Sequence, residues 1–234
     1  MSAFDIDGKF FRGLTKAGDF IILGALTTVF SLPVITMGPA LTAAYYVALR
    51  EVRNEEGYVW QSFWKSFKQN FKQGFLIELI LIVVGLLLFF DLKASADWYY
   101  NEGSTIGMIF MYGVIGLGVI FGAMLLYVFA MLSQFDNTVV NTLKNSLVIC
   151  THHLPQTIFM VVATYGLLYF SVIYFTALIV TIPFILYLNA YILERVFRPF
   201  IKQAAQSYED NKYADALEDE LNEETDEKIE KNND

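Results

Sequence analysis

The chain has 234 residues, of which 56% are hydrophobic and 16% aromatic, and its formal net charge at pH 7 is −8. Its apolar residues come in long blocks, which indicates an integral membrane protein and excludes a soluble globular domain. The negative charge is local, because residues 209–234 hold 12 acidic residues against 3 lysines and leave the rest close to neutral.

The N-terminal stretch mixes aromatic and basic side chains before the first apolar block. Residues 4–18 therefore predict a short interfacial helix that leaves the N-terminus in the cytoplasm. Three residues, Pro33, Gly38 and Pro39, then interrupt the apolar sequence. Because proline ends or kinks a helix, we expect two membrane segments, at about 20–32 and 39–53, joined by a Pro/Gly turn.

Arg50 and Arg53 lie at the far end of the second segment, so basic residues flank the pair on both sides. Basic flanks mark the cytoplasmic side, and two such flanks imply an even number of crossings. Each arm is shorter than the about 20 residues of a full span. The alternative to a full hairpin is a re-entrant pair that dips into the bilayer and returns, with other helices covering its backbone.

Residues 58–73, YVWQSFWKSFKQNFKQ, have the pattern of a basic amphipathic helix that lies flat on the cytoplasmic face of a bilayer. Aromatic residues recur at intervals of three and four and form one stripe, which contacts lipid, packs within the protein or binds a partner. The stripe and its lysines are Trp60, Phe63, Trp64, Phe67 and Phe71, with Lys65, Lys68 and Lys72.

The remaining segments follow from the apolar blocks and the charges between them. Residues 91–105 are rich in acidic and aromatic side chains and predict an outside loop, whereas residues 137–152 predict another cytoplasmic interfacial helix. The predicted membrane segments are about 74–90, 106–132, 157–174 and 177–197, with a turn near 174–177. Residues 205–234 predict a disordered acidic tail.

Taken together, these segments predict an all-α, polytopic membrane helix bundle. It has about six membrane segments, cytoplasmic amphipathic helices and both termini in the cytoplasm of a bacterial cell. One cysteine, Cys150, permits no intramolecular disulfide.

Two stretches, SLPVITMGPALTAAYY at 31–46 and RNEEGYVWQSFWKSFKQNFKQ at 53–73, resemble the YesL-like family. That family comprises multi-pass membrane proteins of undetermined molecular function, mainly from Gram-positive bacteria. Their genes often lie beside those for sugar ABC importers and polysaccharide-degrading enzymes. The resemblance implies an association with carbohydrate uptake, and it transfers no catalytic residue.

Glu78 is the one charged residue inside the apolar block that begins at Gly74. An unpaired carboxylate at that depth costs about 2 kcal/mol or more, so it needs a partner or access to water. It could reach the interface, pair with a basic residue there, or act in an ion or proton path. A proton path would need further intramembrane acids or histidines, which the sequence does not offer.

Two other motifs have both a structural and a functional interpretation. The GxxxG of Gly118 and Gly122 is typical of close helix packing. Cys150, His152 and His153 lack a fourth ligand for zinc, and no catalytic triad or nucleotide motif is present. We therefore expect no metal, no cofactor and no nucleic-acid partner.

Residues 143–157, LKNSLVICTHHLPQT, resemble the coupling helix of ABC importer permeases, which ends in a Leu-Pro run and docks on the ATPase subunit. The glycine and alanine pattern that normally precedes the Leu-Pro is absent. Leu154-Pro155 could equally begin the next helix.

These observations favour a non-enzymatic accessory or regulatory subunit of a carbohydrate (oligosaccharide) ABC importer, in contact with membrane lipid and with permease and ATPase subunits. The alternative is an independent small-solute transporter or channel, suggested by the broken first hairpin and Glu78. A membrane enzyme or a lipid-binding scaffold is a third possibility. The sequence does not fix the oligomeric state.

Overall fold

The computed structural model describes residues 9–55, 57–173, 180–203 and 206, and every element in this part of the chain is helical. The predicted all-α class is therefore confirmed for these residues. The helices are α1 (Lys9–Ser31), the 3-10 helix η1 (Val34–Thr36), α2 (Met37–Val52), α3 (Val59–Glu102), α4 (Thr105–Gln134), α5 (Val139–His152), α6 (Leu154–Ile173) and a last helix, Val180–Gln203.

The chain divides into two compact units, Met1–Leu193 and Glu194–Asp234. In the second unit, the end of the last helix carries an ion pair of 3.6 Å between Arg198 and Glu194, one helical turn apart. The predicted turn near 174–177 lies outside the described residues, as do residues 1–8 and, apart from Gln206, the predicted tail 205–234. The packing described below concerns the first unit.

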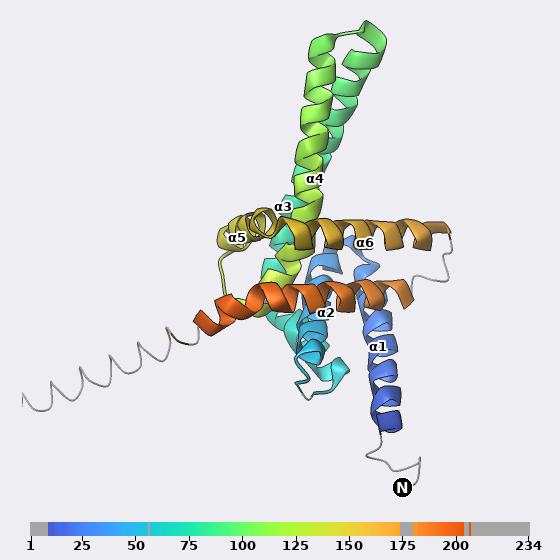
Figure 1. Ribbon diagram of the computed structural model, residues 1–234, viewed down its shortest axis with the longest axis vertical. Coiled ribbons are helices and arrows are strands. Elements are labelled where there is room, and N and C mark those ends of the chain that lie inside the picture. Colours follow the sequence, from blue (N-terminus) through green and yellow to red (C-terminus); the bar gives the residue numbers. More distant parts are fainter. Residues whose placement is uncertain (1–8, 56, 174–179, 204–205, 207–234) are drawn as a thin grey trace, which may run out of the picture. The chain divides into compact units, whose positions relative to one another are not determined.

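The break between α1 and α2 falls at residues 32–36, where η1 makes one tight turn and the chain reverses (Figure 1). Pro33 has no N–H to continue α1, whereas Pro39 stands in the first turn of α2, where helices leave N–H groups unbonded anyway. Thr36 stabilises the turn, because its Oγ1 donates to the carbonyl oxygen of Phe30 at 2.6 Å.

A single helix, α3, replaces three predicted elements: the interfacial helix 58–73, the segment 74–90 and most of the outside loop 91–105. No proline occurs between residues 58 and 104, and the two glycines inside the helix, Gly74 and Gly85, each lower helix stability by only about 1 kcal/mol. The helix ends only at Gly103, whose φ of 64° gives a left-handed cap with its N–H on Tyr99. Likewise α1 joins residues of the predicted helix 4–18 to the segment 20–32.

The later helices lie close to their predicted ranges. Ser104 begins α4, because its Oγ accepts a hydrogen bond from the Gly107 N–H at 3.3 Å. In Figure 1, α3 and α4 lie side by side and antiparallel, joined at Gly103–Ser104. Thr138 caps α5 in the same way, through the N–H of Asn141 at 3.4 Å.

Within the described residues, four helices are long and apolar enough to cross a bilayer: Val59–Glu102, Thr105–Gln134, Leu154–Ser171 and Val180–Gln203. They indicate a membrane protein. Four of the six predicted membrane segments thus lie on helices that are long and apolar enough to cross a bilayer. With 16 residues, α2 is shorter than the about 20 residues of a full crossing.

The centre of the first unit is α2, which contacts α1, α3 and α4. Four alanines make this close packing possible, since small side chains let helix backbones approach. They are the fully buried Ala40, Ala43, Ala44 and Ala48.

Candidate functional site

The tightest contact in the core is a glycine crossing between the start of α2 and the middle of α3. A Cβ added to Gly38 would lie 2.6 Å from the carbonyl oxygen of Gly74, and one added to Gly74 would lie 3.0 Å from the nitrogen of Pro39. Neither site has room for a side chain. The two backbones therefore touch because both residues are glycine.

Glu78 lies one turn beyond Gly74 and is buried, with 6% of its surface exposed. Its Oε2 accepts a hydrogen bond of 3.0 Å from the backbone N–H of Gly38. That N–H is one of the donors that a helix leaves unbonded at its N-terminus, where the helix dipole also favours a negative charge. Glu78 is thus satisfied by a backbone donor at the N-terminus of α2, and not by a basic residue or by the interface as the sequence predicted.

The glycine crossing and the carboxylate together hold the broken hairpin against α3. We call Gly38, Pro39, Gly74 and Glu78 the hairpin clamp. In this clamp a buried carboxylate has its hydrogen-bond partner and two helix backbones are in contact. Such an arrangement is suited to fixing the positions of the helices.

The aromatic stripe of residues 60–71 packs mainly inside the protein. Phe30, near the end of α1, lies 5.7 Å from the ring centroid of Phe63 and 5.2 Å from that of Phe67. Phe63 and Phe67 are buried, whereas Trp60 is 55% exposed. Of the alternatives that the sequence left open, internal packing therefore accounts for the middle of the stripe.

The remaining aromatic residues of the stripe, Trp64 and Phe71, are half-buried beside Phe67. The rings of Phe67 and Phe71 are 5.5 Å apart, and Trp64 stacks on Phe67 at 5.6 Å. The lysines of the stripe, Lys65, Lys68 and Lys72, are all exposed, and Lys68 Nζ lies 4.9 Å from the Trp64 ring. These basic side chains remain available to lipid headgroups or to an acidic partner.

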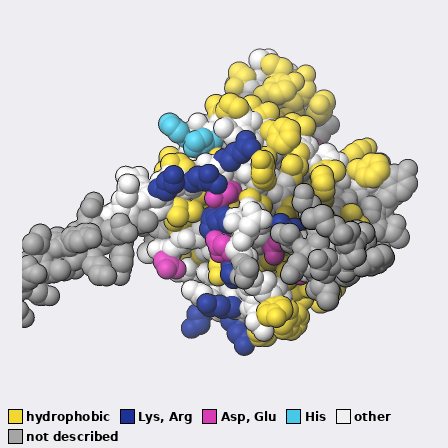
Figure 2. Space-filling model, turned by 60° about the horizontal axis from the view of Figure 1, so that its bottom comes forward, with side chains coloured by type: hydrophobic (Ala, Val, Ile, Leu, Met, Phe, Trp, Pro, Cys, Tyr) yellow, Lys and Arg dark blue, Asp and Glu magenta, His cyan; other side chains and the backbone are white. Residues whose placement is uncertain are grey.

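The charged turn between α2 and α3 is internally paired. Arg50 Nε lies 3.0 Å from a Glu55 carboxylate oxygen, and Arg50 Nη1 donates to Ser62 Oγ at 3.0 Å. Arg53 lies 3.8 Å from the other oxygen of Glu55. Figure 2 shows lysine, arginine and acidic side chains gathered on one face, beside surface that is mostly hydrophobic.

The two glycines of the GxxxG motif have different surroundings. A Cβ added to Gly122 would lie 3.1 Å from the Tyr165 hydroxyl, which donates to the Gly122 carbonyl at 3.1 Å. A Cβ added to Gly118 would meet nothing within 4 Å. The structure therefore places Gly122 against α6 and leaves Gly118 facing open space.

Cys150 is buried, and its Sγ lies 3.2 Å from the carbonyl oxygen of Leu147. Burial raises the pKa of this thiol, which disfavours the reactive thiolate. The rings of His152 and His153 are 5.5 Å apart. Among the described residues, no group of three His, Cys, Asp or Glu side chains could hold a metal ion.

A buried polar cluster joins three helices and was not predicted from the sequence. Asn189 of the last helix donates to Thr164 of α6 at 3.0 Å and to the Tyr45 hydroxyl of α2 at 3.4 Å. All three residues are buried. An asparagine inside an apolar stretch was the only available signal.

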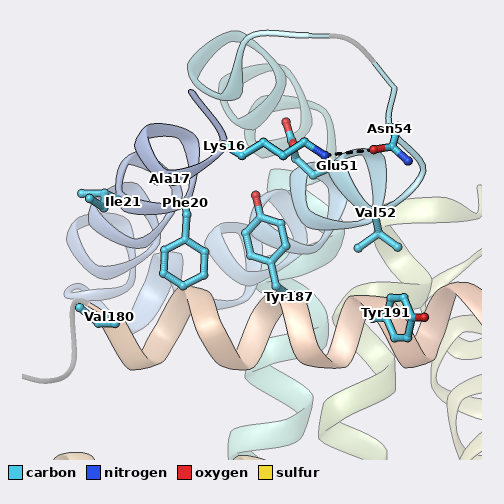
Figure 3. A pocket seen from close by; sticks show the side chains of 10 residues that line it. All are labelled: Lys16, Ala17, Phe20, Ile21, Glu51, Val52, Asn54, Val180, Tyr187 and Tyr191. Carbon is cyan, nitrogen blue, oxygen red and sulfur yellow. Dashed lines mark hydrogen bonds between the residues drawn. The ribbon is translucent and has the colours of Figure 1, made fainter. Parts of the chain in front are cut away.

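A cleft of about 650 Å³ opens between α1, the end of α2 and the last helix (Figure 3). Lys16 crosses its polar edge and donates to Asn54 Oδ1 at 3.1 Å, with Glu51 behind them. Phe20 and Tyr187 stack at 5.4 Å between ring centroids and form the aromatic floor. The cleft combines charged groups at one edge with an apolar interior, as ligand sites do.

Comparison with known proteins gives one match. Residues 21–92 are similar to the family "Protein of unknown function, DUF624". This family includes the YesL-like proteins. Searches of the curated proteins and of the solved structures returned no match. The matched segment contains α2 and the complete hairpin clamp, so the similarity covers the best-packed part of the fold.

Proposed function

We propose that this protein is a non-enzymatic accessory or regulatory subunit of a carbohydrate ABC importer in a bacterial cell membrane, with both termini in the cytoplasm. Its similarity to a family that includes YesL-like proteins supports the carbohydrate context. The observation that carries the proposal is the outer face of α5.

α5 has 14 residues, too few to cross a bilayer, and it connects two candidate spans. Its buried side mixes polar and apolar residues, Thr142 and Ser146 with Ile149 and Cys150. Ser146 donates to the carbonyl of Thr142 at 2.7 Å, within the same helix. Its exposed side carries Val140, Leu147 and Val148. A helix that turns apolar residues outward needs lipid or a partner to cover them.

The position of α5 favours a partner of the coupling-helix type. It stands on a short connection between spans and is followed by Leu154-Pro155, where α6 begins. An importer ATPase presents a groove to such a helix in permeases, and this similarity is the reason for choosing an importer over an unrelated partner.

Affinity purification of the tagged protein from native membranes in mild detergent, followed by mass spectrometry, tests the association. We expect permease and ATPase subunits in stoichiometric amounts. Val148→Asp should remove them, whereas Asn145→Asp, which adds the same charge at an exposed polar position of α5, should not. Isolation of the protein without importer subunits would refute the proposal.

The second candidate is an independent small-solute transporter or channel. The observation that favours it is the broken hairpin, since interrupted helices build substrate sites in transporters. However, one donor of the α2 N-terminus, the Gly38 N–H, is already bonded to Glu78 and is not free for a substrate. Solute flux in vesicles that contain only this protein would support this candidate over the first.

A further inference from the structure

The cleft between α1, α2 and the last helix has two chemically different ends. At the polar end, Lys16 is exposed and uses one of its three ammonium donors on Asn54. At the other end, Ile21 and Val180 are exposed and lie together at one side of Figure 3. Exposed apolar side chains continue beyond them, at Ile22 and Phe184.

This gradient fits an amphiphile that enters from the bilayer. The polar end belongs to the segment that precedes α3, which the basic residues assign to the cytoplasmic headgroup region. The apolar end opens on exposed apolar side chains, which acyl chains of a bilayer can cover. A volume of about 650 Å³ is within the usual range of small-molecule sites.

The charges at the polar end select the headgroup. Glu51 lies within electrostatic reach of Lys16, Arg50 and a second carboxylate, Asp19. Arg50 is already paired with Glu55. Among the cleft-lining residues that the structure describes, Lys16 is the one cation, and it faces Glu51 with Asp19 nearby. A zwitterionic headgroup can place its phosphate at Lys16 and its ammonium at the carboxylates, whereas a purely anionic headgroup has no group to pair with the carboxylates.

We propose that this cleft binds a glycerophospholipid with a primary-amine headgroup. Its phosphate contacts Lys16, its ammonium donates to Glu51, and its glycerol and first acyl carbons lie on Phe20 towards Ile21 and Val180. A primary ammonium is preferred to a trimethylammonium because only the former donates hydrogen bonds to a carboxylate. Lipid binding at this cleft does not depend on the association with an importer.

Native mass spectrometry of the full chain in neutral detergent tests the headgroup. The protein is mixed with equal amounts of phosphatidylethanolamine, phosphatidylglycerol and phosphatidylcholine that carry the same acyl chains. We expect phosphatidylethanolamine to be retained about fivefold better than either competitor. Equal retention of the three lipids, or preference for phosphatidylglycerol, would overturn the proposal.

Two variants and two controls locate the site. Glu51→Gln and Lys16→Gln should each lower retention of phosphatidylethanolamine about fivefold. Glu102→Gln and Lys93→Gln make the same changes near the far end of α3 and should leave retention unchanged. A loss of retention in the controls equal to that in the cleft variants would contradict a site at this cleft.

A measurement on the unmodified chain avoids any folding defect of the variants. A phosphatidylethanolamine with a photoreactive diazirine near its glycerol is added to vesicles that contain the protein. After irradiation, we expect peptide adducts at residues 16–22 and 180–191. Adducts found only elsewhere would overturn the proposal.

Discussion

The two halves of α3 are both rich in apolar residues, yet they lie in different surroundings. The first half buries Phe63, Phe67 and Ile77 against the hairpin of α1 and α2. The second half exposes Leu87, Phe89 and Phe90, because α4 is its main neighbour among the described helices. Which residues of α3 are buried therefore depends on which other helices pack against each half. The hydrophobicity of the helix alone does not distinguish residues of the protein core from residues that face lipid.

The glycines likewise divide into those in close contact with another helix and those that face open space. Gly38 and Gly74 touch backbone, whereas Gly113, Gly116 and Gly118 of α4 have no side-chain or backbone neighbour within 4 Å of an added Cβ. A glycine in a helix therefore marks a close contact only where another element packs against it.

Matched phenylalanine truncations should give the largest difference between the two halves. Phe63→Ala removes a fully buried ring and should lower the free energy of unfolding by about 3–5 kcal/mol. Phe89→Ala removes a ring that is 60% exposed and should cost less than about 1 kcal/mol in detergent. Equilibrium unfolding in mixed micelles measures both, and similar losses would mean that the second half is also a protein core.

Replacing a glycine by alanine adds one methyl group and compares the space around Gly38 with that around Gly118. Gly38→Ala forces a Cβ against the Gly74 carbonyl, and overpacking of this kind costs about 1–3 kcal/mol. Gly118→Ala meets no neighbour and should change stability by less than about 0.5 kcal/mol. The midpoint of thermal unfolding in detergent checks this, and equal tolerance of both changes would rule out the clamp contact.

Replacement of Glu78 separates its hydrogen bond from its charge. Glu78→Leu leaves the Gly38 N–H buried without an acceptor and should cost about 1–2 kcal/mol. Glu78→Gln keeps an oxygen acceptor and should cost less. The same unfolding assay compares the two variants; a greater loss for glutamine than for leucine would argue against the helix-capping role.

The smallest expected effect is the loss of one buried hydrogen bond between α4 and α6. The Tyr127 hydroxyl lies 2.7 Å from Thr157 Oγ1, which also contacts the Cys150 carbonyl at 2.8 Å. Tyr127→Phe therefore leaves Thr157 with a partner and should cost about 0.6 kcal/mol. Tyr112→Phe, at an exposed tyrosine of α4, is the control and should not change the unfolding midpoint.

Features that depend on neighbouring residues could be predicted from the sequence. Pro33 cannot continue α1 and Pro39 suits the first turn of α2, so the break between these helices could be predicted from the local sequence. The range of α5 could also be predicted to within two residues, because its N-terminal cap is the neighbouring residue Thr138.

Features that depend on distant residues could not be predicted. Glu78 accepts a hydrogen bond from a backbone N–H 40 positions earlier. Nearly every residue has a backbone N–H, so the sequence does not indicate which one is the donor. The cleft needs three helices whose packing no pattern specifies. The acidic loop predicted at 91–105 is mostly helix because charged side chains are compatible with a helical backbone, which continues here to the left-handed cap at Gly103.

In the topology that we propose, α3 carries the chain from the cytoplasmic face to the opposite face. In a Cys150→Ser background, single cysteines at exposed Gln61 and Glu102 report the two ends of this helix. A membrane-impermeant maleimide should label Glu102→Cys in intact cells and Gln61→Cys only in inverted vesicles. Labelling of both positions from the same side would contradict a crossing by α3.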